Sequence, residues 1–135
     1  MIMAQNLVDV FDSVSALARV GGDEEFLYEI AGLVRAAWPR LLVDIRTDLA
    51  ARDFFAVEAD ARLARAAALY VSAKKAQDAA LQLQTMAVQS DLPGALRASA
   101  RLEEEVGKLQ LVLTTFRSPK NLPLPSAGMA FAQEL

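Results

Sequence analysis

The chain has 135 residues and a formal net charge of −3. This size suits one domain, and the charge argues against nucleic acid as the main partner, because phosphate binding needs a basic face. Histidine and cysteine are both absent, which excludes Ser-His and Cys-His nucleophiles, disulfides and zinc sites built on those residues. No cofactor, metal or catalytic residue is expected.

Two helices are predicted in the first part of the chain. Asp12 or Ser13 caps a short helix that runs through Ala18. Asp23 caps a long helix that closes near Ala51, because apolar residues recur along it at three- and four-residue spacing.

Pro39 lies inside this long helix. A proline removes one backbone donor, so we expect a bend between Arg35 and Trp38. The apolar spacing resumes directly after the proline, so the helix should continue.

Three more helices follow, each after a short break. Asp53 caps the first of them, Ser72 the second and Asp91 the third, with Pro93 in its first turn. Short connections between long helices predict an all-α fold, an antiparallel (up-down-up-down) four-helix bundle preceded by the short helix, over residues 1–117.

Residues 118–135 differ in composition from the rest. They are rich in proline, which predicts an extended C-terminal tail. Met129, Phe131 and Leu135 are apolar enough to dock against another surface.

No apolar run approaches the ~20 residues that a membrane-spanning helix needs. The first residues also lack the basic start of a signal peptide. We therefore expect a cytoplasmic protein with no membrane partner.

Five short motifs follow one another within residues 17–116: Gly-Gly-Asp-Glu-Glu-Phe at 21–26, Trp-Pro-Arg-Leu-Leu at 38–42, Arg-Asp-Phe at 52–54, Val-Ser-Ala at 71–73 and Ser-Asp-Leu at 90–92. In order and spacing they resemble the Gly-Gly-Asp, Ala-Pro-x-Leu-Leu, Gly-Asp-Trp/Phe, Leu-Gly-Ala and Gly-Asp-Leu motifs of histidine-containing phosphotransfer (HPt) domains. That family carries a phosphoryl group on a surface imidazole, in a His-x-x-Lys-Gly motif, and exchanges it with an aspartate of a response-regulator receiver domain.

The family's spacing from Phe54 places Arg62 in the histidine position, Arg65 in the lysine position and Ala66 in the glycine position. A second register, which needs one insertion later, places Ala61 in the histidine position. A guanidinium stays protonated and has no lone pair to attack with, so neither register keeps a phosphoacceptor.

The resemblance therefore implies a non-enzymatic binding module of two-component signalling, which docks a receiver domain without phosphotransfer. Arg62 and Arg65 share a helix face and could pair with the acidic active site of the receiver, or remain ordinary surface arginines. The predicted docking face consists of Arg62, Arg65, Ala66, Ala61, Leu69, Trp38 and Ala37.

Two other functions stay open. The bundle could be a structural protein that homodimerises through the alanine-rich face around Trp38, although Trp38 could instead pack at the Pro39 bend. It could also be an enzyme with another phosphoacceptor, Asp60 or Ser72.

Overall fold

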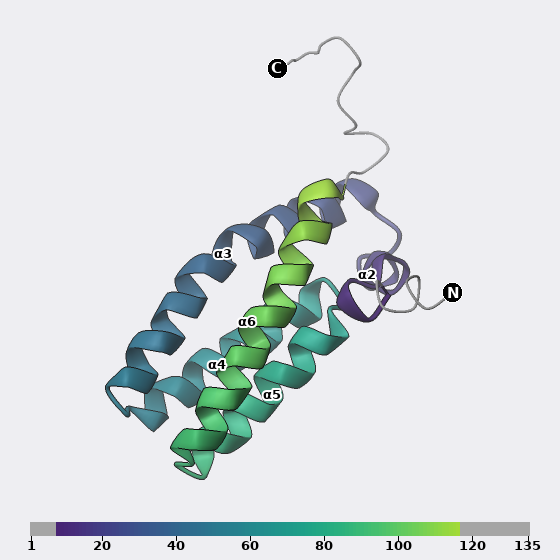
Figure 1. Cartoon of the computed structure of the whole chain (residues 1–135). Coiled ribbons are helices and arrows are strands. Elements are labelled where there is room, and N and C mark those ends of the chain that lie inside the picture. The colour runs from purple at the N-terminus through teal and green to yellow at the C-terminus, as the bar shows by residue number, and fades with distance from the viewer. Residues whose placement is uncertain (1–7, 117–135) are drawn as a thin grey trace.

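The computed structural model describes residues 8–116 (Figure 1). This part of the chain contains helices and turns but no strand, so the all-α prediction is confirmed for it. The predicted tail, residues 118–135, lies outside the described residues. The helices are α2 (Ser13–Arg19), α3 (Glu24–Ala50), α4 (Phe54–Tyr70), α5 (Lys74–Val88) and α6 (Leu92–Thr115).

The four long helices lie side by side around one core (Figure 1). Each packs against the next along the chain, and α6 also packs against α3. The most extensive contact joins α4 and α5, where small side chains allow the backbones to come close. The buried alanines of these two helices are Ala61, Ala64, Ala68, Ala76, Ala79, Ala80 and Ala87. A helical bundle is thus present, while its antiparallel order stays a prediction.

Aspartate caps set the starts of four helices, because a carboxylate accepts a backbone N–H that has no partner within the helix. In each case the acceptor is Oδ1 and the donor is the amide three residues later, at 2.9–3.1 Å. The four caps are Asp12, Asp23, Asp53 and Asp91. The predictions for these helix starts are confirmed.

Ser72 does not cap α5, so that prediction was wrong. The N-cap is Ala73, which makes no side-chain cap bond. Ser72 instead adopts a φ of 51° in the turn, and its Oγ accepts a hydrogen bond from Nε of Arg19 at 3.1 Å. The backbone N–H of Asp12 also donates to the Ser72 carbonyl, at 3.2 Å. These two bonds attach α2 to the turn between α4 and α5.

Candidate functional site

The predicted docking residues of α4 divide into an exposed set and a buried one. Arg62, Arg65, Ala66 and Leu69 are exposed, whereas Ala61 is fully buried. Ala61 belongs to the inward stripe that repeats every three or four residues along α4. Its assignment to the docking face was therefore wrong.

Trp38 is also buried completely, so it cannot form part of a docking face. Its position follows Val34 and precedes Ile45 on the core stripe of α3, at helical spacing. The indole Nε1 is enclosed without a hydrogen-bond partner in residues 8–116. Ala37, the next residue back, is exposed. The periodicity of α3 already indicated a core position for Trp38. A homodimer contact through Trp38 is therefore wrong as well.

A small polar network holds the two arginines of α4. Arg62 Nη1 lies 3.9 Å from Glu58 Oε2, one helical turn earlier. Arg65 Nη1 donates to Gln84 Oε1 of α5 at 3.1 Å, and Gln84 Nε2 donates to Glu58 Oε2 at 3.4 Å. The Arg62 side chain remains 57% exposed. The network holds both guanidinium groups at the surface, with Arg62 beside the Glu58 carboxylate and Arg65 linked to that carboxylate through Gln84.

Sequence reasoning missed Glu58 and Gln84. The i, i+4 spacing of Glu58 and Arg62 was a usable signal for the first contact. Gln84 comes from another helix, and no sequence pattern pointed to it.

The two registers of the resemblance differ in exposure. Position 61 faces the core, and position 62 faces solvent. Only the register through Arg62 places its key residue where another protein could reach it.

Asp60 and Ser72, the alternative phosphoacceptors, both have constrained side chains. Burial, a hydrogen bond with Asp48 and the negative charges of Asp48, Asp44 and Asp53 raise the pKa of Asp60 to about 7. A carboxyl group that is partly protonated near neutral pH is a weak nucleophile. Ser72 is buried in its turn and bound by an arginine.

Residues 8–116 contain no acidic cluster suited to a metal ion.

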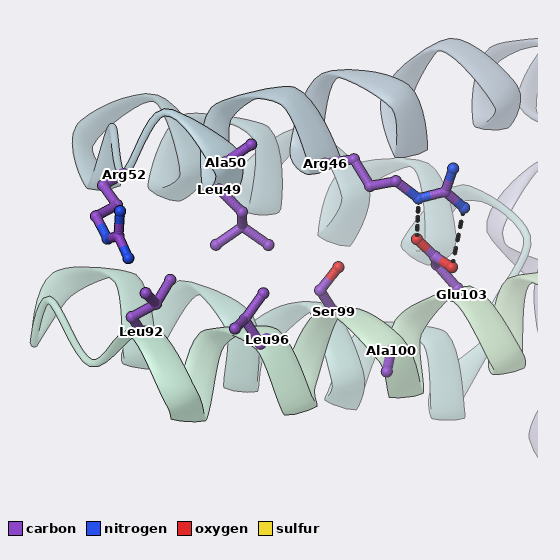
Figure 2. Close-up of a pocket in the computed structure, with 9 residues that line it drawn as sticks. All are labelled: Arg46, Leu49, Ala50, Arg52, Leu92, Leu96, Ser99, Ala100 and Glu103. Carbon is purple, nitrogen blue, oxygen red and sulfur yellow. Dashed lines mark hydrogen bonds and ion pairs between the residues drawn. The ribbon is translucent and has the colours of Figure 1, made fainter.

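A separate groove of about 420 Å³ runs between α3 and α6. Figure 2 shows leucine side chains from both helices in its middle. At one end Arg46 of α3 donates from Nε and Nη2 to the two carboxylate oxygens of Glu103 of α6, at 2.9 and 3.1 Å. Arg52 lies at the other end (Figure 2). The groove belongs to a different helix pair from the arginines of the docking face.

None of the helices within residues 8–116 combines the length and the apolar character needed to cross a bilayer.

No protein-family model, curated protein or solved structure matches this chain.

Proposed function

We propose that this protein is an HPt-like antiparallel four-helix bundle that binds a response-regulator receiver domain without exchanging phosphoryl groups. The closed ring of contacts among α3, α4, α5 and α6, with the short α2 before them, supports the bundle arrangement. Receiver domains of this kind are cytoplasmic, and the proposal places the protein in the same compartment.

Three turns support the resemblance on which the proposal rests. The positions aligned with glycines of the family motifs are Arg52, Ser72 and Ser90, and their φ angles are 55°, 51° and 53°. This left-handed region favours glycine, because a Cβ atom is crowded there. The backbone thus makes glycine-type turns at these three positions of the family's turn motifs, although the residues themselves have changed.

The observation that carries the proposal is the exposed pair Arg62 and Arg65 on α4. These residues occupy the positions of the phosphoacceptor and its neighbouring lysine in the register that faces solvent. Their guanidinium groups complement the carboxylates of a receiver active site, and charge-assisted hydrogen bonds of this type are strong. Ala66 adds only one methyl group where the family has glycine, which makes the approach tighter without blocking it, and Leu69 adds an apolar contact.

The lost chemistry defines the role. An arginine cannot accept a phosphoryl group, because its guanidinium has no free lone pair at physiological pH. A phosphorylated receiver bound at this face therefore keeps its phosphoryl group, and an unphosphorylated one stays unphosphorylated. The protein acts as a sequestering partner or an adaptor, and not as an enzyme.

The direct test is a titration of the full chain against the receiver domains of its own organism. Arg62→Ala should weaken binding, and the loss should shrink as salt rises, since exposed charges are screened. Arg97→Ala is the matched control, because Arg97 is an exposed arginine of α6 outside the docking face. Binding to no receiver domain, or equal losses for the two variants, would contradict the proposal.

A homodimer is the alternative, and it now has to use other residues than Trp38. The outer surface of α3 exposes Leu33, Ala37 and Val43, with Leu33 73% exposed. Contiguous apolar patches mark interfaces, and Leu33 and Ala37 are one helical turn apart on this surface. Light scattering tests this alternative, because a stable dimer of the free protein would favour the structural role.

A further inference from the structure

The groove between α3 and α6 has the features of a binding site. Its volume of about 420 Å³ falls within the range of small-molecule pockets, which are mostly apolar with a few polar groups. The apolar walls come from Leu49 and Ala50 of α3 and from Leu92, Leu96 and Ala100 of α6 (Figure 2).

The two ends of the groove carry different electrostatic groups. The ion pair of Arg46 and Glu103 joins the two helices and closes one end. Arg52 stands at the opposite end, and no carboxylate within the described residues pairs with it. The unpaired guanidinium there attracts an anion.

Ser99 adds a second polar group on the groove wall. The residue is only 6% exposed, and its hydroxyl makes no hydrogen bond within residues 8–116. Figure 2 shows the hydroxyl directed across the groove toward α3. The enclosed unpaired side-chain atoms of the described residues do not include this oxygen, so it is open to the groove, where water or an occupant can bond it. Ser99 is therefore positioned to bond a polar atom of an occupant.

The spacing of these groups defines the occupant. Arg52 reaches toward Leu92, and Ser99 lies seven residues further along α6, which is about 10 Å at the rise of an α-helix. One head group cannot contact both the guanidinium and the hydroxyl. An occupant that uses both groups is elongated, with an anionic end, an apolar middle and a second polar end.

We propose that this groove binds a medium-chain ω-hydroxy carboxylate or a molecule of the same chemistry. The carboxylate pairs with Arg52, the alkyl chain lies on Leu49 and Leu96, and the terminal hydroxyl bonds Ser99. The groups that limit the groove at both ends favour a discrete molecule over a peptide of a partner protein. The site is independent of receiver docking, because none of the residues that line the groove belongs to the predicted docking face.

Calorimetric titration of the full chain with ω-hydroxydecanoate tests the site. Arg52→Gly should weaken binding about tenfold through loss of a charge-assisted bond, whereas Arg52→Lys should retain most of it. Glycine suits the φ of 55° at this position, so Arg52→Gly stays folded and lacks only the cation. Arg97→Ala, outside the groove, should bind as the wild type does.

Decanoate, which lacks the terminal hydroxyl, isolates the contribution of Ser99. Wild-type protein should bind ω-hydroxydecanoate about fivefold more tightly than decanoate, the effect of one net hydrogen bond. Ser99→Ala should remove this preference and leave the affinity for decanoate unchanged. The proposal is overturned if ω-hydroxydecanoate does not bind, if Arg52→Gly binds it as the wild type does, or if the preference persists in Ser99→Ala.

Discussion

Gln110 of α6 donates a hydrogen bond from Nε2 to the backbone carbonyl of Arg35 in α3, at 2.9 Å. Arg35 lies four residues before Pro39, whose nitrogen has no hydrogen to donate. The carbonyl has therefore lost its usual helical partner, and a neighbouring helix supplies the replacement. This contact explains how α3 continues through the proline to Ala50.

Gln110→Ala should lower the free energy of unfolding by about 1–2 kcal/mol, because it leaves the part-buried carbonyl of Arg35 without a donor. In a Pro39→Ala background the same change should have a much smaller effect, since an alanine at this position restores the helical N–H. Urea unfolding of the four proteins, followed by circular dichroism, gives the coupling energy. Simple additivity would show that the two residues do not share this carbonyl.

Glycine in the left-handed turns should stabilise the protein. Arg52→Gly and Ser90→Gly should each raise the free energy of unfolding by about 0.5–1 kcal/mol, the relief of backbone crowding less the added entropy of the unfolded chain. Ser72→Gly should raise the free energy of unfolding by less, because it also removes the hydrogen bond from Arg19. Thermal unfolding measures all three, and an equal gain at Ser72 would argue against a stabilising role for that bond.

Asp60 should make stability depend on pH. Its pKa is raised to about 7 in the folded protein, whereas an unfolded aspartate titrates near 4. Between these values the folded chain holds a proton that the unfolded chain has released. Stability is therefore greatest below this window and decreases as the pH rises through about 7.

Asp60→Asn should flatten this dependence, because asparagine keeps a hydrogen-bond donor and cannot ionise. The wild type should lose more thermal stability than the variant between about pH 5 and about pH 8, the window in which Asp60 ionises. Asp78→Asn, an exposed aspartate of α5, is the control and should behave as the wild type. Parallel pH profiles for wild type and Asp60→Asn would refute the assignment.

An imidazole placed at position 62 tests the proposed register of the HPt resemblance. The triple change Arg62→His, Arg65→Lys and Ala66→Gly recreates the family motif on the exposed side of α4. The imidazole nitrogen should attack the phosphorus of an aspartyl phosphate in a bound receiver, as the P–O bond to the aspartate breaks. After incubation with a receiver that carries a radiolabelled phosphoryl group, the variant should acquire an acid-labile label and the wild type should acquire none.

Leu63→His provides the matched control for this experiment. Leu63 neighbours Arg62 on α4 and is 59% exposed, so it offers an accessible imidazole that points in a different direction. Labelling of Leu63→His as strong as that of the triple variant would mean that accessibility alone suffices and that the register through Arg62 is not special.

The helix starts could be predicted because capping is local: Asp23 and Asp53 meet amides three residues away. The core side of α4 could be predicted as well, because Val57, Ala61, Ala64 and Ala68 recur at three- and four-residue spacing. Ala61 was placed on the docking face from the resemblance, against this spacing. Ser72 was misassigned because its partner, Arg19, lies 53 positions earlier in the chain.

The groove could not be predicted from the sequence, because the residues that line it lie far apart in the chain. Neither the motif at 52–54 nor any pattern around Ser99 links these two residues, and they line one groove only because α3 packs against α6. Pairing of distant helices depends on the whole core, which no local pattern encodes.

The complete burial of Trp38 has a practical consequence. It is the single tryptophan of the chain, so fluorescence excited selectively at the indole reports one side chain in the core. Its emission should shift to longer wavelength only when water reaches the interior. Neither the α4 face nor the groove includes Trp38, so this optical signal distinguishes loss of structure from occupancy at either surface.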